Sequence, residues 1–188
     1  FDIVDVYRGA SRMDYLKLTN LNGIYIRQAD EDRLTRDVLE RLTHRPDLSH
    51  RDLSIGGNAA GRIRTLMPAL KERAKTTLEL ADSAAFLARA VPLPMEPKAA
   101  AALTAEARLM LRDVASALAE TDFTVPAIDA ALRGFAEGRG VKLGQVAQPL
   151  RAALTGSTVS PGIDATLAAL GREEALVRIR AASSDVAT

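Results

Sequence analysis

The sequence has no cysteine and no tryptophan, and aromatic residues make up only 4% of it. Without cysteine, disulfide bonds, thiolate metal sites and a cysteine nucleophile are all excluded. The chain also lacks any run of about 18 or more apolar residues, the length expected of a helix that spans a membrane. We therefore expect a cytoplasmic protein that is stabilised by an ordinary hydrophobic core and makes no contact with a membrane.

Motifs for catalysis and for phosphate binding are missing as well. The only two histidines, His44 and His50, lie six residues apart around Pro46, and this spacing matches no metal site. Gly56-Gly57 is not followed by the Lys-Ser or Lys-Thr of a phosphate-binding loop, and no Gly-x-Ser-x-Gly turn occurs. We expect the histidines to lie on a solvated loop, and the chain to carry no catalytic residue, metal or cofactor of its own.

Apolar residues, mainly alanine and leucine, make up 47% of the chain, and charged residues make up 26%. Ala, Leu, Arg and Glu are strong helix formers, so this composition favours an all-α fold with a substantial core. Apolar residues at helical spacing predict helices over 30–42, after 58 and again towards 87, over 98–120, after Thr124, and over 143–154, 163–170 and 172–180. Residues 1–28 fit either a helix or a hairpin that turns at Asn22-Gly23.

Prolines divide this helical pattern. Residues 91–97 contain three prolines, so the segment cannot be helical throughout and marks the best domain boundary in the chain. Pro68 and Pro149 fall inside otherwise helical patterns, where proline interrupts or kinks a helix. Turn-forming residues follow Pro149 at 157–162, and a polar turn between rigid helices is suited to receive unstacked bases. A plain helix–turn–helix corner would give the same pattern.

The net charge is only +1, so a site for nucleic acid would have to be a local patch. Two stretches are locally basic, namely residues 62–75, with five cations against one acid, and residues 133–151, with four cations against one acid. Clusters of this kind neutralise phosphates and release counterions. They are also common on ordinary solvated helix faces, so both interpretations stay open at this point.

Three segments resemble a known family. Residues 140–156, extended by the Ser160-Pro161-Gly162 turn, closely resemble the signature near the carboxyl end of bacterial glutamyl-tRNA synthetases. Residues 13–27 resemble the family's segment just past the catalytic core, and residues 71–76 resemble its Glu-Arg-x-Lys-Thr helix. The segments occur in the family's order and roughly its spacing, so the resemblance covers nearly the whole chain.

This resemblance implies an all-α fold in which a two-part helical cage grips the anticodon arm of a tRNA. It implies three domains, with the end of the stem-contact domain at 1–36 and the two anticodon-binding subdomains at 37–91 and 92–188. The family's His-Ile-Gly-His-like and Lys-Met-Ser-Lys-Ser-like motifs are absent here, as is an initiator methionine. We interpret the chain as the C-terminal part of a class I enzyme that attaches glutamate to tRNA with ATP and Mg, and we expect this part to be inactive alone.

The resemblance also assigns roles to individual residues. It implies that Arg73 reads the third anticodon base, and that Arg151, Ser160, Pro161 and Ile163 contact the first two. Other positions are expected to contact the tRNA without reading its sequence: Lys71, Lys75, Arg139 and Lys142 at phosphates, and Asn22 and Arg27 at the stem.

The chemistry of Arg73 suits this role. Glutamate anticodons end in cytosine, whose pairing edge presents the acceptors O2 and N3, and a guanidinium is a donor only. Glutamine anticodons end in guanine, whose N1–H and amine would face the same donors. One arginine side chain can therefore bind cytosine and disfavour guanine at this position. The expected partner is tRNA(Glu), and also tRNA(Gln) if the parent enzyme is non-discriminating, with the protein acting as a monomer. The alternative function is a free-standing helical module that binds a protein partner through an apolar groove.

Overall fold

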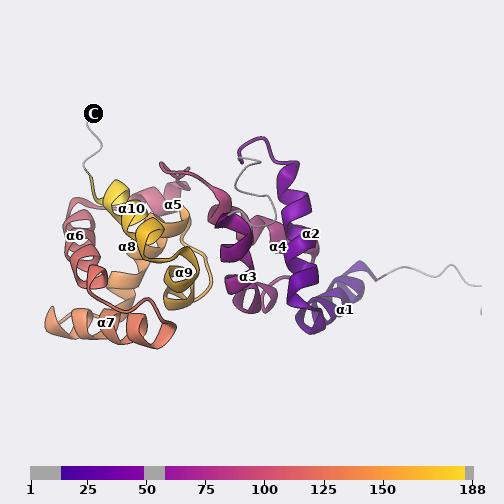
Figure 1. The fold of residues 1–188 in the computed structure, drawn as a ribbon, viewed down its shortest axis with the longest axis horizontal. Coiled ribbons are helices and arrows are strands. Elements are labelled where there is room, and N and C mark those ends of the chain that lie inside the picture. The colour runs from indigo at the N-terminus through magenta and orange to yellow at the C-terminus, as the bar shows by residue number, and fades with distance from the viewer. Residues whose placement is uncertain (1–13, 49–57, 185–188) are drawn as a thin grey trace, which may run out of the picture.

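The computed structural model describes residues 14–48 and 58–184, and every regular element in these ranges is helical. The elements are α1 (Tyr15–Gln28), α2 (Glu31–Thr43), α3 (Asn58–Lys71), α4 (Thr77–Ala84), the 3-10 helix η2 (Ala85–Ala88), α5 (Pro97–Ala102), α6 (Ala105–Ala119), α7 (Val125–Gly138), α8 (Leu143–Thr155), α9 (Ile163–Leu170) and α10 (Arg172–Ser183). The predicted all-α fold is confirmed, and residues 15–28 form a helix rather than a hairpin (Figure 1). None of the described helices is both long and apolar enough to cross a membrane.

Short polar side chains set where several helices begin. Asp30 accepts a hydrogen bond from the backbone nitrogen of Arg33 at 2.9 Å, and Thr76 accepts one from that of Glu79 at 3.1 Å. Each bond satisfies a backbone donor that has no partner in the first turn, so it fixes the start of α2 and of α4. The apolar stripe predicted for α2 is buried, as expected: Leu34, Val38 and Leu42.

The two prolines inside helical patterns do not end their helices. Pro68 lies on the exposed side of α3, which continues to Lys71, and Pro149 is buried in α8, which continues to Thr155. A proline removes one hydrogen bond from the helix but leaves the flanking turns intact. Packing of α3 and α8 against the rest of the fold therefore outweighs the local cost.

The single helix predicted over 98–120 is wrong, because the structure has two helices there. Leu103 leaves the helical conformation, with ψ of 57°, and Thr104 starts α6 by accepting from the backbone nitrogen of Ala107 at 3.2 Å. The freed carbonyl of Leu103 accepts a hydrogen bond from Nε of Arg108 at 3.2 Å. The break contains neither glycine nor proline, so the spacing of apolar residues did not reveal it.

The helices form two bodies, the N-terminal body from α1 to η2 and the C-terminal body from α5 to α10 (Figure 1). Residues 89–96 join them without helix, where the three prolines predicted a break. In the N-terminal body α2 packs against α3 and α4, and in the C-terminal body α10 packs against α6 and α8. The predicted boundary at 36/37 falls inside α2, and residues 1–13 lie outside the described residues, so the three-domain division stays a prediction.

A buried arginine holds the two bodies together. Arg178 of α10 is only 1% exposed, and its Nε lies 2.7 Å from a carboxylate oxygen of Glu174, which also pairs with Arg62 of α3 at 3.2 Å. Its other two nitrogens donate to three backbone carbonyls from both bodies and the linker: Phe86, Leu154 and Arg89, at 2.8–2.9 Å. Burial lowers the pKa of Arg178, and its pairing with Glu174 opposes that shift. No pattern in the sequence predicted this role for Arg178.

Candidate nucleic-acid interface

Two arginines from different bodies meet at Ser160. Nη1 of Arg73, just past the end of α3, donates to the backbone oxygen of Ser160 at 3.1 Å, across 87 residues of sequence. Nε of Arg151, on α8, donates to the hydroxyl of the same serine at 2.9 Å. Three of the five predicted anticodon-binding residues thus lie together, and we refer to Arg73 and Arg151 as the paired arginines.

Helix packing brings these residues together. α9 of the C-terminal body packs against α3 of the N-terminal body, so the start of α9 lies near the end of α3. α8 ends at Gly156, whose left-handed φ of 75° reverses the chain into the 156–162 turn. Arg151 lies in the last turns of α8, and the remaining predicted residues, Pro161 and Ile163, are buried beneath the turn. Ser160 is buried as well, at 8% exposed, whereas Arg73 and Val159 beside it are exposed.

The 156–162 turn is held by its own hydrogen bonds. The backbone nitrogen of Ser157 donates to the hydroxyl of Thr155 at 3.1 Å, and the Ser157 hydroxyl donates to Glu96 at 2.9 Å. The backbone nitrogen of Val159 donates to that hydroxyl at 3.2 Å. Because these bonds fix the turn without a ligand, little conformational entropy would be lost when a ligand binds here.

The electrostatics at Ser160 favour an electron-rich ligand. Burial lowers the pKa of Arg151, and the positive charge of Arg73 lowers it further. In the described part of the chain, neither of the paired arginines forms an ion pair with a carboxylate. Carbonyl oxygens, ring nitrogens or phosphates would relieve the repulsion between the paired arginines, because each accepts hydrogen bonds from a guanidinium.

A cavity of about 220 Å³ lies beside Arg73 and has mostly apolar walls. Leu70, Ala74 and Pro161 line it, and Val159, which is 74% exposed, stands at its edge. Glu79 and Ser83 also line it, and neither was predicted as a site residue, whereas Val159 belongs to the turn predicted to receive bases. Apolar walls beside hydrogen-bonding groups suit a flat, polar-edged ring such as a nucleobase.

The four predicted phosphate contacts differ in exposure and in whether an ion pair already engages their charge. Nζ of Lys71 lies 2.9 Å from a carboxylate oxygen of Glu31, with only 15% of its side chain exposed. Arg139 pairs with Asp113 and lies over a ring, Phe135, at 5.1 Å. Lys75 and Lys142 are exposed and form no ion pair with the described residues. Only the last two present uncommitted ammonium groups.

The two predicted stem contacts lie on α1. Asn22 donates its side-chain amide to the backbone oxygen of Lys75 at 2.6 Å, so it fastens α1 to the turn that carries Arg73. Arg27 is exposed. Asn22 therefore has a structural partner that the sequence did not reveal, while Arg27 remains available on the surface.

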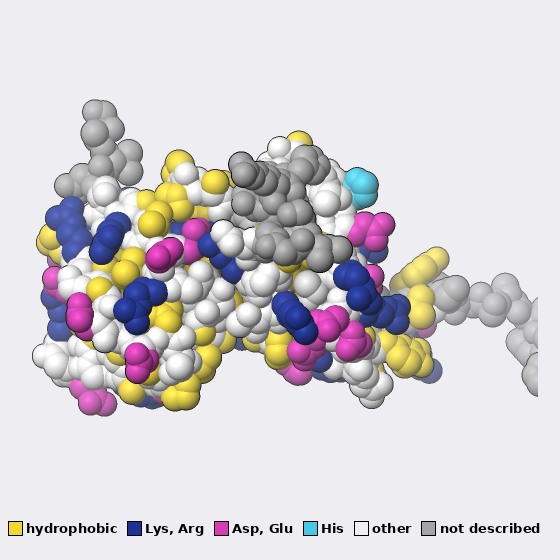
Figure 2. Space-filling model, viewed as in Figure 1, with side chains coloured by type: hydrophobic (Ala, Val, Ile, Leu, Met, Phe, Trp, Pro, Cys, Tyr) yellow, Lys and Arg dark blue, Asp and Glu magenta, His cyan; other side chains and the backbone are white. Residues whose placement is uncertain are grey.

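Charges of both signs are mixed over the visible face of the molecule, so no broad basic surface covers it (Figure 2). His44 is exposed, as predicted, and His50 and Gly56-Gly57 lie outside the described residues. Within the described ranges no cluster of three metal-binding side chains occurs. Recognition of a nucleic acid by this face would therefore depend on local contacts rather than on a broad positive surface.

Comparison with known proteins gives a consistent result. Residues 33–183 match the family described as "Anticodon binding domain". Glutamate–tRNA ligase 1 of Gluconacetobacter diazotrophicus is 59% identical over 182 residues, which cover 96% of this chain and 38% of that protein. The enzyme of the same name from Granulibacter bethesdensis is 55% identical over 96% of this chain and 36% of its own length.

A solved structure shares the fold. The glutamate tRNA ligase of Elizabethkingia meningosepticum, crystallised with its amino acid, superposes with a TM-score of 0.78 at 22% identity. That similarity covers 97% of this chain and 35% of the solved one. The chain thus spans less than two fifths of the length of the relatives it matches.

Proposed function

This chain belongs to the anticodon-binding domain family, and we propose that it holds the anticodon arm of tRNA(Glu) for a cytoplasmic, monomeric glutamate–tRNA ligase. The resemblance to glutamyl-tRNA synthetases inferred from the residues is confirmed by the matching relatives. The parent enzyme would supply the ATP and Mg chemistry that attaches glutamate, since this chain carries no motif for it. The alternative of a protein-interaction module has no support among the relatives.

The observation that carries this proposal is the convergence of the paired arginines on Ser160. We propose that Arg73 directs its remaining donors at O2 and N3 of the third anticodon base, cytosine, while Nη1 stays on the Ser160 carbonyl. Guanine would face the same donors with its own N–H groups and be disfavoured. Arg151 would contact the first two bases together with the 156–162 turn, and Lys75 and Lys142 would contact phosphates, which position the arm without reading its sequence.

Arg151→Ala is expected to weaken binding of a glutamate anticodon stem-loop by roughly 1–3 kcal/mol, the scale of one good base contact. α8 should persist, because alanine is the stronger helix former. The measurement is a fluorescence-anisotropy titration at one fixed salt concentration, with circular dichroism as a check on folding. Arg133→Ala is the matched control, since Arg133 is an exposed arginine of the same body that pairs with Asp129. Equal affinities for the two folded variants would place the site elsewhere.

Arg73→Gln is expected to reduce the preference for cytosine over guanine at the third anticodon position by roughly 5- to 150-fold, the equivalent of about 1–3 kcal/mol. The donor-only fork becomes an amide that both donates and accepts, so guanine is no longer rejected. Two stem-loops that differ only at this base are titrated with each protein at the same salt concentration. Lys75→Gln serves as the control, because loss of a phosphate contact should weaken both stem-loops alike. If Arg73→Gln keeps the same preference for cytosine over guanine, Arg73 does not read this base.

A further inference from the structure

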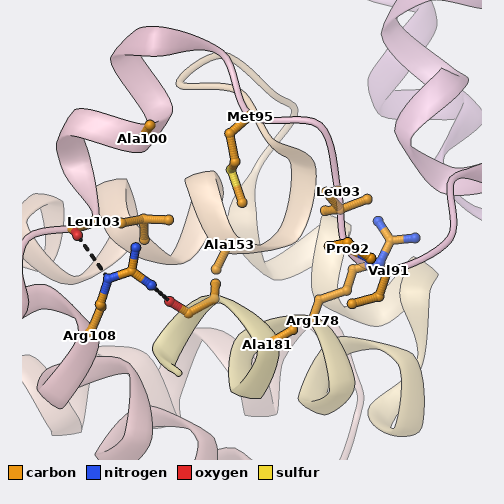
Figure 3. A pocket seen from close by; sticks show the side chains of 11 residues that line it. Val91, Pro92, Leu93, Met95, Ala100, Leu103, Arg108, Ala153, Arg178 and Ala181 are labelled. Atoms are coloured by element: carbon orange, nitrogen blue, oxygen red, sulfur yellow. Dashed lines mark hydrogen bonds between the residues drawn. The ribbon is translucent and has the colours of Figure 1, made fainter. Parts of the chain in front are cut away.

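A second cavity, of about 300 Å³, lies beside the linker between the two bodies (Figure 3). Its walls are mainly apolar and come from the linker, from the α5–α6 region, and from α8 and α10: Leu93, Met95, Leu103, Ala153 and Ala182. It shares no lining residue with the cavity at Ser160. Its volume is at the lower end of the range that holds small ligands.

Two guanidinium groups line this cavity, and no acid does. The first, Arg178, has all three of its nitrogens hydrogen-bonded, to Glu174 and to three carbonyls, so it forms part of the wall. Its charge is answered by the Glu174 carboxylate at 2.7 Å. The second guanidinium, Arg108, has different surroundings.

Arg108 is bonded only to carbonyl oxygens. Its Nε donates to Leu103, and its Nη1 donates to Ala182 and Ser184. Nη2 makes no hydrogen bond to the described residues and is turned away from the two bonds drawn in Figure 3. The described part of the chain offers Arg108 no carboxylate partner. An apolar cavity thus carries at its wall a guanidinium edge with two donors and a charge that no described residue pairs with.

We propose that this cavity binds a small hydrophobic monocarboxylate, with its apolar part against Leu93, Met95 and Leu103 and its carboxylate on Nη2 of Arg108. Charge complementarity favours an anion, because a charge-assisted bond to a carboxylate is stronger than one to a neutral acceptor. The lining favours an apolar body, because burying it removes hydrocarbon surface from water. A neutral hydrocarbon would leave the donors of Nη2 without a partner, and a polar anion would leave the walls unfilled.

The test uses octanoate, with 1-octanol as its neutral counterpart, on the full 188-residue chain labelled with ¹⁵N. Octanoate should shift the amide signals of residues around the cavity, such as Leu93, Leu103 and Ala182, in a saturable way. Octanol should bind at least roughly tenfold more weakly, since it lacks the charge. Equal affinity for the two probes, or shifts confined to other surfaces, would overturn the proposal.

Matched variants locate the binding. Arg108→Met should lower octanoate affinity roughly tenfold, whereas Arg172→Met should not, since Arg172 bonds the carbonyls of Ala119 and Thr121 away from the cavity. Ala100→Leu should block the cavity from its exposed edge, and Ala101→Leu, on the same helix but not lining it, should leave binding unchanged. Because Ala100 is exposed, this second pair decides the matter even if Arg108→Met fails to fold. Undiminished binding by Ala100→Leu would contradict the assignment.

Discussion

Arg178→Met is expected to lower the free energy of unfolding by about 3–5 kcal/mol, the scale for removing one member of a buried charged network. Methionine fills much of the volume but donates nothing. The carbonyls of Phe86, Leu154 and Arg89 would lose a buried donor, and each unsatisfied group costs about 1–3 kcal/mol. Glu174 would keep Arg62 as a partner, which limits its share of the loss.

Urea unfolding followed by far-UV circular dichroism measures this change. Arg180→Met is the control, because Arg180 lies two residues away on the same helix and is exposed. Its effect should stay within about 0.5 kcal/mol, as for most surface substitutions. If the two variants lose similar stability, the network around Arg178 does not hold the bodies together as described.

Gly156→Ala should destabilise the protein by roughly 2–5 kcal/mol, from two separate costs. The first is the left-handed conformation, since Gly156 has φ of 75°. The second is steric, because a Cβ atom would lie 2.2 Å from the carbonyl oxygen of Pro94, a backbone atom that cannot rotate away. The backbone must therefore shift where Glu96 donates its N–H to the Gly156 carbonyl at 2.8 Å.

Gly140→Ala separates these two costs. Gly140 also has a positive φ, 66°, but a Cβ there would meet nothing within 4 Å. It should lose only about 1 kcal/mol, the conformational cost alone. Thermal or urea unfolding gives the loss of stability in each variant, and the difference between the two losses is the steric cost at Gly156. Equal losses in the two variants would refute the clash with Pro94. Gly156→Ala should also weaken stem-loop binding, because its turn carries Ser160.

The sequence predicted most of the helices because their limits depend on local chemistry. Asp30 caps α2 with its side chain, Thr124 precedes α7 without a side-chain capping bond, and glycines follow α8 and α9. The break at Leu103 escaped prediction because it has no proline or glycine. It depends instead on a cap from Thr104 and on Arg108 taking the freed carbonyl. Both interactions involve residues that also occur in uninterrupted helices.

The candidate site was predictable only in part. The family resemblance named Arg73, Arg151 and Ser160, but their meeting depends on the packing of α3 against α9, which no local pattern encodes. The partner of Lys71 was hidden for the same reason, since Glu31 lies on another helix. Arg178 was missed because charged residues spaced along α10 suggest a solvated face. Burial of one among several similar arginines is a property of the tertiary structure alone.

The paired arginines come from different bodies, and this has a thermodynamic consequence. A ligand that requires both binds only the arrangement in which α3 lies against α9. By mass action it then stabilises that arrangement, by about 2.7 kcal/mol when the free ligand is at 100 times its Kd. The coupling is reciprocal, so any change that loosens the contact between the bodies raises the Kd by the corresponding factor. If the proposed function holds, affinity for the anticodon arm is thereby linked to contacts between the bodies outside the proposed site, such as that of Arg62 with Glu174.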